Sequence, residues 1–313
     1  MKVCFVGTGS IGKRHITNLY NLCIKMQENL VIHVLRSRKK QLDASLAPMI
    51  DKEVYSINEM DRFYDAIFIC NPTFKHYDSI NELKSYAKSF FVEKPVFDSI
   101  KYTIDELKLP IDNQYYVACP LRYNRVLMYA KEVLKDKKVI SVQAISSSYL
   151  PDWRKGVDYR ETYSAKREEG GGVQIDLIHE WDYLVELFGY PDKVLSFAGK
   201  YSDLEITSDD IAVYIARYAD KLVELHLDYF GMMSKRNLRV WTTSEEYLFD
   251  IFNNRVYRDG ECIECYEEDR NEMYLREMEH FIDIMKVKST SNNSLEHALE
   301  VMKIAQNYGE KAE

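Results

Sequence analysis

The chain has 313 residues, of which 46% are hydrophobic and 29% charged, and its net charge is −8. This length and composition predict a globular protein of two domains with enough chain for a large core. The negative charge excludes general nucleic-acid binding, which requires a basic surface. No apolar run approaches the ~20 residues that cross a bilayer, and the first strand starts at once, so we expect a cytoplasmic protein without a membrane partner.

The first 120 residues alternate between strand-like and helix-like segments. Strands are predicted at "KVCFVG", "LVIHVLRS", "YDAIFICNP", "SFFVEKP" and "QYYVACP", with helices over residues 11–26 and 75–87. Near-continuous apolar strands separated by helices are typical of a parallel sheet with both faces covered. Right-handed crossovers make such a sheet doubly wound. We therefore predict an α/β domain with a doubly wound parallel sheet over residues 1–121.

From residue 122 the pattern changes. A helix over 124–134 leads into an alternating strand, "KVISVQAISSSYL", and a long irregular stretch precedes a helix over 173–188. Alternating strands follow at "KVLSFAGKY", "DIAVYIARYA", "LVELHLDYF", "RNLRVWTT" and "EEYLFDI", and helices over 269–286 and 294–311 close the chain. Residues 122–313 are thus predicted to form an α+β domain with a large, mostly antiparallel open sheet. Its exposed face suits a homodimer or homotetramer, and the C-terminal helix is also able to pack back on the first domain.

A glycine motif follows the first strand. Gly7, Gly9 and Gly12 fit G-x-G-x-x-G, with Ser10 and Ile11 between them at the start of the predicted helix. The first glycine permits a tight turn, the second lets the backbone approach a pyrophosphate, and the third lets the helix pack on its strand. The helix N-terminus offers N–H groups and a partial positive charge to the phosphates. The motif predicts a Rossmann domain that binds a dinucleotide.

The second strand runs into Arg36, Ser37 and Arg38. Sites for NAD usually place an Asp or Glu here, which accepts from the ribose hydroxyls. A guanidinium pairs with a 2′-phosphate and a hydroxyl can donate to it, whereas a carboxylate repels it. We therefore expect NADP(H) as the cofactor, with NAD(H) as the alternative if these side chains are only solvated.

The six cysteines predict free thiols and no metal centre. Cys4, Cys70 and Cys119 lie in apolar runs, as buried thiols of a reducing compartment do. The single C-x-x-C, Cys262 and Cys265, follows a predicted hairpin turn, so we expect the two side chains on opposite faces of a strand. No second pair completes a tetrahedral site, and no metal is expected.

Two further stretches carry groups suited to proton transfer. "FFVEKP" places Glu93 and Lys94 at the carboxyl end of a parallel strand, where such sheets hold ligands. In "GGGVQIDLIHEWD", Asp176 and His179 share one face of the predicted helix. A lysine and a histidine beside a nicotinamide suit hydride transfer, because a proton must leave the substrate hydroxyl as the hydride leaves its carbon.

The order of G-x-G-x-x-G, E-K-P and G-G-G…D…H resembles that of the Gfo/Idh/MocA oxidoreductases, which include glucose–fructose oxidoreductase and inositol dehydrogenase. The resemblance covers essentially the whole chain. It implies that Lys94 contacts substrate and nicotinamide, and that Asp176 and His179 are the catalytic carboxylate and the acid/base. It also implies further contacts: Glu93, Asn71, Pro72 and Thr73 with the cofactor, and Arg122, Tyr123 and His179 with the substrate.

One position departs from the pattern of the family. The histidine commonly lies four residues after the aspartate, whereas His179 lies three after Asp176 and Glu180 takes the fourth place. Both spacings keep the side chain on the same helical face. His179 is the predicted acid/base, and Glu180 stays open as the alternative.

The irregular stretch before the glycines carries aromatic and basic side chains: Trp153, Arg154, Tyr159, Arg160 and Tyr163. Rings suit the apolar faces of a sugar, and guanidinium groups suit a carboxylate, a phosphate or a nucleotide diphosphate. Packing within a loop or an interface would use the same residue types. Since the resemblance implies sugars and cyclitols as substrates, we expect one of these or an acidic or nucleotide-linked sugar derivative.

The sequence thus predicts an NADP(H)-dependent oxidoreductase that passes a hydride between the nicotinamide and a hydroxyl or keto carbon of such a substrate. Two alternatives remain. One is a glycoside hydrolase that retains NAD and oxidises its substrate transiently. The other is a noncatalytic cofactor-binding sensor or partner subunit.

Overall fold

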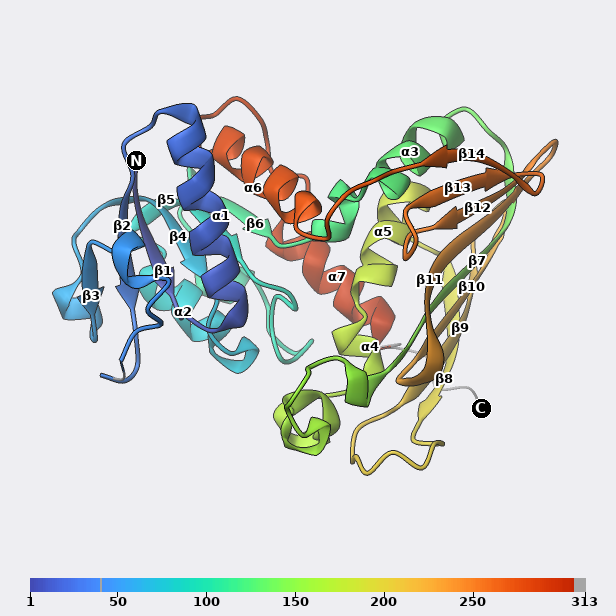
Figure 1. Cartoon of the computed structure of the whole chain (residues 1–313), viewed down its shortest axis with the longest axis horizontal. Helices are drawn as coiled ribbons and strands as arrows, with labels where there is room; N and C mark the ends of the chain where they lie inside the picture. The colour runs from blue at the N-terminus through green and yellow to red at the C-terminus, as the bar shows by residue number, and fades with distance from the viewer. Residues whose placement is uncertain (40, 307–313) are drawn as a thin grey trace. The chain divides into compact units, whose positions relative to one another are not determined.

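The computed structural model describes residues 1–39 and 41–306. It consists of two compact units (Figure 1). The first unit comprises Met1–Pro120 and Arg270–Leu299, and the second comprises Leu121–Asp269 with residues 300–306. The assignment of separate functions to residues 1–121 and 122–313 stays a prediction.

The first unit is built on a parallel sheet with the strand order β3-β2-β1-β4-β5-β6. Its strands are β1 (Lys2–Val6), β2 (Val31–Leu35), β3 (Lys52–Val54), β4 (Tyr64–Ile69), β5 (Ala87–Val92) and β6 (Gln114–Val117). Its helices are α1 (Ser10–Met26), α2 (His76–Leu83) and α6 (Glu272–Met285). Right-handed crossovers run outward in both directions from β1 and β4, which places α1 and α2 on opposite faces. The predicted doubly wound sheet is confirmed.

Two details of this unit differ from the prediction. The short strand β3 (Lys52–Val54) was not expected, because only Val54 of its residues is buried and it carries no apolar run. Helix α2 ends at Leu83 and not at residue 87. Ala87 instead pairs with Tyr64 and begins β5, so sheet pairing overrides a helical pattern that continues in the sequence.

Aromatic side chains fill the core of the first unit. Phe5 stacks on Phe68 with ring centroids 4.2 Å apart, and Phe68 stacks on Phe91 at 5.3 Å. Phe281 of α6 packs edge-on against both Phe68 and Phe91. Helix α6 therefore completes the core of the Rossmann sheet although it follows the second unit's strands in the sequence.

The second unit is built on an eight-stranded sheet with the order β14-β13-β12-β11-β7-β10-β9-β8. Its strands are β7 (Val139–Tyr149), β8 (Lys193–Gly199), β9 (Ile211–Arg217), β10 (Leu222–Asp228), β11 (Phe230–Thr242), β12 (Glu246–Asp250), β13 (Arg255–Arg258) and β14 (Glu261–Cys265). Only β7 and β10 pair in parallel, so the predicted mostly antiparallel open sheet is confirmed. The other elements are α3 (Arg125–Leu134), α4 (Val173–Asp176), α5 (His179–Phe188) and α7 (Leu295–Ala305), of which α7 begins in the first unit. The part of the predicted C-terminal helix beyond residue 306 lies outside the described residues.

The helix predicted over residues 173–188 is interrupted. Helix α4 ends at Asp176, Leu177 has φ −98° and ψ 28°, and α5 begins at His179. Asp176 and His179 therefore do not lie on one continuous helix. The prediction that they share one face of a single helix is wrong.

The C-x-x-C hairpin forms as predicted, but the orientation of its cysteines is corrected. Asp259 and Gly260 both have positive φ, as the tight hairpin turn between β13 and β14 requires. Cys262 pairs with Tyr257 and Cys265 with Arg255, with a register shift between them. Tyr257 and Arg255 are two residues apart and share a face, so both cysteines lie on that face. A one-residue bulge in β14 reverses the expected alternation.

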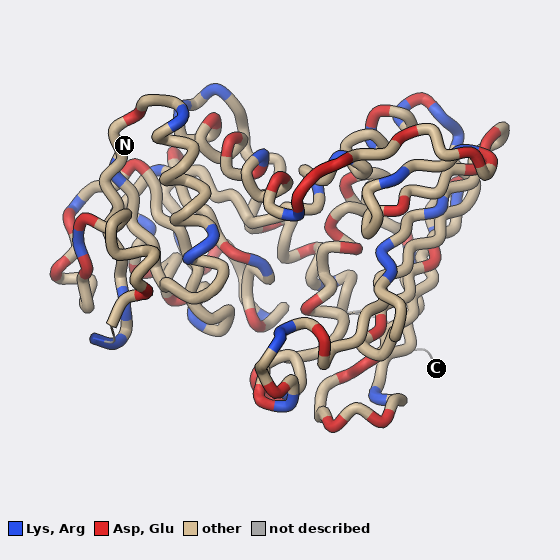
Figure 2. Tube along the Cα trace, in the orientation of Figure 1, with Lys and Arg blue, Asp and Glu red and all other residues tan. Residues whose placement is uncertain are grey.

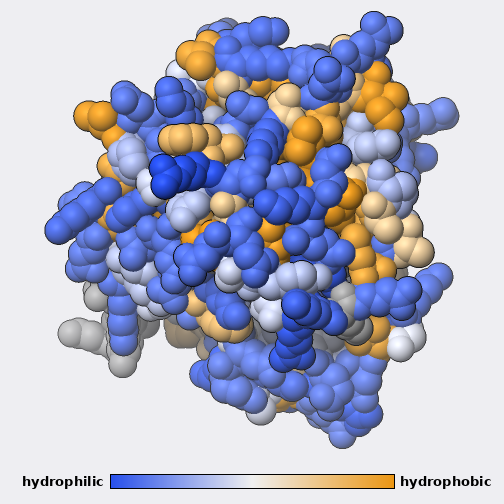
Figure 3. Space-filling view, turned by 90° about the vertical axis from the view of Figure 1, so that its left-hand side faces the viewer, coloured by the Kyte–Doolittle hydropathy of each residue, from blue (hydrophilic) through white to orange (hydrophobic). Residues whose placement is uncertain are grey.

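Figure 2 shows Lys and Arg interspersed with Asp and Glu along the chain. Figure 3 looks onto the first unit from the side of β3 and shows a mostly hydrophilic face with small apolar patches. Within residues 1–39 and 41–306, no helix is long and apolar enough to cross a membrane. The same residues contain no group of three or more His, Cys, Asp or Glu side chains arranged to hold a metal ion.

Candidate functional sites in the two units

The three glycines of the first unit meet three different requirements. Gly7 has φ +98°, and a Cβ there would lie 2.9 Å from the backbone N of Asn71. A Cβ on Gly12 would lie 2.5 Å from the carbonyl oxygen of Gly7. Gly9, the residue before α1, has open space where its Cβ would be. No acidic residue occupies the first turn of α1, so no carboxylate of that turn competes with an anion for its N–H groups and positive end.

The loop after β4 adds an unsatisfied acceptor beside this space. The side-chain nitrogen of Asn71 donates to Ser79 Oγ at 2.8 Å, whereas its Oδ1 is buried without a hydrogen-bond partner among the described residues. Pro72 is exposed and Thr73 is half-buried. A buried acceptor without a donor is costly, and a ligand hydroxyl or amide would satisfy it. The residues present therefore fit a dinucleotide.

A buried pair orders the loop after β5. His15 of α1 is fully buried, and its Nε2 lies 2.5 Å from Oε1 of Glu93. The second carboxylate oxygen of Glu93 accepts from the backbone N–H of Lys94 at 3.1 Å. One carboxylate oxygen of Glu93 thus contacts His15 and the other accepts from the Lys94 backbone. Together they orient the backbone from which the Lys94 side chain extends. Sequence reasoning named Glu93 but missed His15, which lies 78 residues away.

His76 links the loops after β4 and β5. Its Nε2 lies 2.9 Å from the carbonyl oxygen of Asn71, and its Nδ1 lies 3.1 Å from that of Pro95. Burial lowers the pKa of His76, although these carbonyl groups and the charge of Glu93 act in the opposite direction. The ring is therefore neutral at pH 7 and acts as a structural bridge between the loops after β4 and β5.

We expect the Glu93 pair to make the protein sensitive to acid. Burial alone raises the pKa of Glu93, but the hydrogen bond from His15 and the charges of His15 and Lys94 outweigh it and bring that pKa below its usual value. When the pH falls below the ordinary pKa of a glutamate, Glu93 takes up a proton more readily in the unfolded chain than in the folded one. The stability that the ionised Glu93 contributes is therefore lost as the pH falls through its folded-state pKa. The unfolding free energies of wild type and Glu93→Gln, measured in urea, should differ most above pH 4.5 and converge below it. A pH-independent difference would contradict this assignment.

The three residues predicted to bind a 2′-phosphate lie at the end of β2, and they differ in exposure. Arg36 has a side chain only 10% exposed, and its guanidinium pairs with Glu53 of β3. Ser37 and Arg38 are exposed. Arg38 forms no ion pair with any residue in the described ranges. Of the three, Ser37 and Arg38 are thus accessible, whereas Arg36 already holds a carboxylate.

In the second unit, Asp176 lies in an aromatic cluster. The Tyr229 hydroxyl donates to Asp176 Oδ2 at 2.6 Å, and burial together with the Asp176 charge raises the pKa of Tyr229. The Trp153 ring packs edge-on against the Tyr229 ring with centroids 5.2 Å apart. Burial, followed by the charge of Asp176, also raises the pKa of Tyr163. Both tyrosines therefore stay protonated donors beside a buried carboxylate.

The glycines before α4 bring this cluster together. A Cβ on Gly171 would lie 2.1 Å from the carbonyl oxygen of Tyr163, so only glycine allows the two segments to approach. The Trp153 indole nitrogen donates to Ser148 Oγ at 2.9 Å, which fixes the ring relative to β7. Sequence reasoning named Trp153, Tyr163 and Asp176 but missed Tyr229. The only available signal was a tyrosine at the end of an alternating strand.

Glu180 and His179 differ in their surroundings. Glu180 is fully buried, and its Oε1 accepts from Arg236 Nε at 2.6 Å. Arg236 belongs to β11, so the Glu180 carboxylate faces the sheet of its own unit. His179 is half-buried and is the first residue of α5.

Arg122 is held by carboxylates of α5. Its Nε and Nη2 donate to the two oxygens of Asp182, each at 2.8 Å, and Nε lies 3.3 Å from Glu186 Oε2. The Arg122 side chain is 4% exposed. Tyr123 beside it is half-buried. This bidentate pair fastens the start of the second unit to α5.

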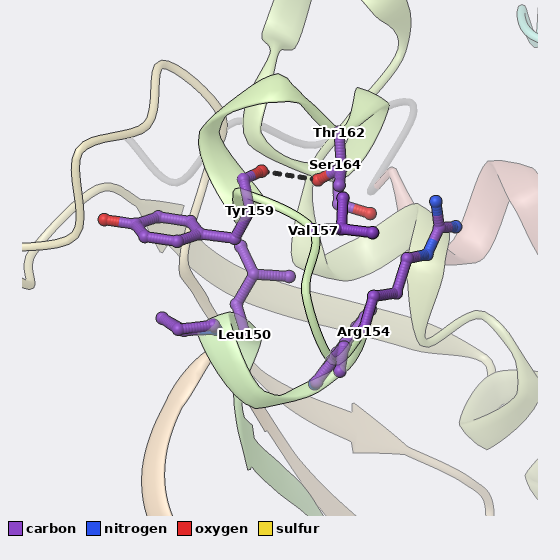
Figure 4. A pocket seen from close by; sticks show the side chains of 8 residues that line it. Leu150, Arg154, Val157, Tyr159, Thr162 and Ser164 are labelled. Atoms are coloured by element: carbon purple, nitrogen blue, oxygen red, sulfur yellow. Dashed lines mark hydrogen bonds between the residues drawn. The ribbon is translucent and has the colours of Figure 1, made fainter.

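The irregular segment between β7 and α4 forms a small surface hollow (Figure 4). It is lined by Leu150, Pro151, Trp153, Arg154, Val157, Tyr159, Thr162 and Ser164. The Tyr159 carbonyl accepts from the Thr162 hydroxyl at 2.6 Å, and the Tyr159 hydroxyl accepts from the Glu205 N–H at 3.2 Å. Arg160 does not line the hollow, because it pairs with Asp158 and Glu205. Among the predicted substrate residues of this segment, the hollow thus gathers Trp153, Arg154 and Tyr159.

The sheet order, the glycine loop and the open second sheet define a class: a Rossmann-domain dinucleotide-binding protein with an α+β second unit. Residues 1–109 match the Gfo/Idh/MocA family model, described as an oxidoreductase family with an NAD-binding Rossmann fold. Residues 1–109 therefore resemble the NAD-binding Rossmann part of the Gfo/Idh/MocA oxidoreductases, in agreement with the motifs.

Individual proteins resemble longer parts of the chain. An uncharacterized oxidoreductase, YrbE of Bacillus subtilis (strain 168), is 27% identical over 193 residues, which cover 59% of this chain and 52% of the relative. The match thus spans about half the length of that relative. The myo-inositol 2-dehydrogenase of Lactobacillus plantarum has a similar fold, with a TM-score of 0.78 and 17% identity over 98% of this chain and 95% of its own. The WlbA dehydrogenase of Bordetella pertussis, solved with NADH and UDP-GlcNAcA, has a TM-score of 0.77 and 16% identity over 98% and 94%.

Proposed function

We propose that the chain is an NADP(H)-dependent oxidoreductase acting on a hydroxyl or keto carbon of a sugar, a cyclitol or a sugar derivative. The observation that carries this proposal is the glycine loop, where Gly9 leaves open space before the N-terminus of α1. The unsatisfied Oδ1 of Asn71 supports it at the neighbouring strand end. A bound nicotinamide dinucleotide supplies or accepts the hydride. Gly7, Gly9, Ser10, Ile11 and Gly12 would hold its pyrophosphate through backbone N–H groups.

The first unit also supplies a cation for the reaction. Lys94 follows the carboxyl end of β5, and its backbone is held by Glu93, which His15 holds in turn. An ammonium group there attracts the substrate oxygen on which negative charge develops. In this proposal Lys94 orients the substrate, and Glu93 and His15 act as positioning residues.

The second unit supplies the proton transfer. Asp176 accepts a hydrogen bond from Tyr229, so its position is fixed. His179 is half-buried, whereas the competing Glu180 is fully buried and bound to Arg236. We therefore assign His179 as the group that removes the hydroxyl proton during oxidation and returns it during reduction. Asp176 remains the carboxylate that the family resemblance implies, and the Tyr229 hydroxyl holds it in place.

The side chains around Asp176 support a sugar-type substrate. Trp153, Tyr163 and Tyr229 offer ring faces and hydroxyl donors beside the carboxylate. Arg154 lines the adjacent hollow and forms no ion pair with any described residue, so its guanidinium is available for an anionic group. The related WlbA structure contains UDP-GlcNAcA, an acidic nucleotide-linked sugar. We assign no substrate contact to Arg160 or Arg122, because carboxylates of their own unit hold both.

We further propose that the open sheet mediates self-association. Leu195, Phe197, Ile215 and Leu222 share one face of β8–β10 and are each more than 40% exposed. Apolar side chains gathered on one face of a sheet favour an interface between copies of the chain. Light scattering should report a homodimer or homotetramer, and a monomer at micromolar concentration would overturn this part of the proposal.

The proposal is tested with purified protein in two steps. Fluorescence titration should show NADPH binding, and tighter binding than that of NADH. Incubation with NADP⁺ and a panel of cyclitols, aldoses and UDP-sugars should then build up reduced nicotinamide, measured by absorbance. Cleavage of a glycoside without net reduction would instead indicate a hydrolase with retained cofactor. Cofactor binding without turnover of any panel member would indicate a sensor.

A further inference from the structure

Glu53 forms an ion pair with Arg36, the arginine that was expected to bind the 2′-phosphate of NADP(H). The end of β2 faces the adenosine ribose in Rossmann domains, and an arginine near it accommodates a 2′-phosphate. Here the Arg36 guanidinium pairs with the Glu53 carboxylate, and the Arg36 backbone N–H donates to the Val54 carbonyl at 3.0 Å. Strand β3, which sequence analysis did not predict, thus presents a negative charge to the predicted phosphate site.

Further contacts keep Glu53 in this place. The Tyr55 hydroxyl donates to Glu53 Oε2 at 2.9 Å, and the Tyr55 backbone N–H donates to Glu59 at 2.9 Å. The Lys39 ammonium lies 5.4 Å from the centre of the Tyr55 ring. The Arg36–Glu53 pair is therefore part of an ordered cluster and not a chance contact between two mobile side chains.

The cluster has a consequence for cofactor selection. A 2′-phosphate brings about two negative charges, so it is repelled by Glu53 and must compete with it for Arg36. A 2′-hydroxyl brings no charge and can donate to a carboxylate. Glu53 therefore acts against NADP(H) and has little effect against NAD(H), while the accessible Arg38 and Ser37 act in favour of NADP(H).

We propose that Glu53 is a specificity-determining residue that occupies Arg36 and so limits the preference for NADP(H) over NAD(H). This inference rests on the proposed dinucleotide binding. It assigns the phosphate contact to Ser37 and Arg38, and it makes Arg36 available to the phosphate only when the charge of Glu53 is removed.

The test compares dissociation constants of NADPH and NADH, measured by fluorescence titration at one salt concentration. Glu53→Gln should raise the preference for NADPH over NADH by about tenfold relative to wild type. Glu53→Ala is the second variant, because a glutamine at position 53 could still hold Arg36 by a hydrogen bond and an alanine could not. Circular dichroism and thermal melting check that each variant is folded.

A matched control removes the same charge elsewhere in the first unit. Glu28 pairs with Lys286, and its side chain is 32% exposed, against 33% for Glu53. Glu28 precedes β2, so it lies at the amino-terminal ends of the parallel strands. The proposed cofactor site lies at their carboxyl ends. Glu28→Gln should leave the preference within about twofold of wild type, because a change in net charge alone acts weakly across a screened distance.

A double-mutant cycle identifies Arg36 as the residue that Glu53 occupies. Arg36→Gln should change NADPH affinity little in wild type but should abolish the gain in Glu53→Gln. An unchanged preference in folded Glu53→Gln and Glu53→Ala, or an equal change in Glu28→Gln, would overturn the inference. A wild type that prefers NADH would overturn the NADP(H) preference in the proposed function, whereas the shift in the variants would still decide the role of Glu53. A wild type that binds neither cofactor would overturn both.

Discussion

Replacing His179 with asparagine should lower kcat by about 10²–10⁴-fold and leave the affinity for NADPH close to that of wild type. Asparagine approximates the size of the ring but cannot exchange a proton near neutral pH. The glycines after β1 and Asn71 belong to the first unit and His179 to the second, so the substitution leaves the residues proposed to bind the cofactor unchanged. Steady-state turnover of a substrate from the panel and fluorescence titration of NADPH measure the two effects separately.

Glu180→Gln provides the comparison for this variant. Glu180 is fully buried against Arg236, so its replacement should lower the free energy of unfolding and leave the pH dependence of kcat in place. Full turnover by His179→Asn would rule out the assignment of His179. A folded Glu180→Gln that loses turnover would transfer the acid/base role to Glu180.

Replacing Arg122 with alanine should destabilise the second unit by about 3–5 kcal/mol, because the nearly buried Asp182 carboxylate loses its cation. Glu186 loses one of two cations and keeps Lys131. The side chains of Asp182 and Glu186 are only 10% and 14% exposed. Urea unfolding monitored by circular dichroism measures the change. Arg122→Lys should recover only part of the stability, since an ammonium group cannot form the two parallel bonds of the guanidinium.

Arg160→Ala is the matched control. Arg160 also pairs with two carboxylates, those of Asp158 and Glu205, but its side chain is 49% exposed. Exposed pairs contribute about 0–1 kcal/mol, so this variant should unfold close to wild type. A folded Arg122→Ala of unchanged stability that fails to bind substrate would restore the substrate contact that the family resemblance implied.

The two arginines show what a residue pattern leaves undecided. Both were expected to contact substrate: Arg122 because the family resemblance implies it, and Arg160 because it lies in an aromatic, basic stretch. An arginine in a sequence is recognised by its charge, whereas its role depends on which carboxylates the fold brings to it. Arg122 and Arg160 both have carboxylate partners in their own unit. The same holds for Arg36, whose partner Glu53 lies on a strand too short and polar to be recognised.

By itself, the sequence determined the features that depend on local pattern. Near-continuous apolar runs predicted the parallel strands, alternation predicted the open sheet, and glycine spacing predicted the turn between β1 and α1. These predictions succeed because strand burial and glycine conformation are properties of a few consecutive residues. The same reasoning failed at the break between Asp176 and His179 and at the bulge in β14, where the backbone departs from regular periodicity without a local signal.

Only the tertiary structure decided which side chains act together. Glu93 meets His15 from 78 residues away, and Asp176 meets Tyr229 from 53 residues away. Such contacts are set by the packing of whole strands and helices, and a residue's chemical type is compatible with many partners until that packing is complete. The sequence therefore identified the groups that could bind and react, and the fold selected their partners, because hydrogen bonds and ion pairs depend on distances of a few ångströms between distant segments.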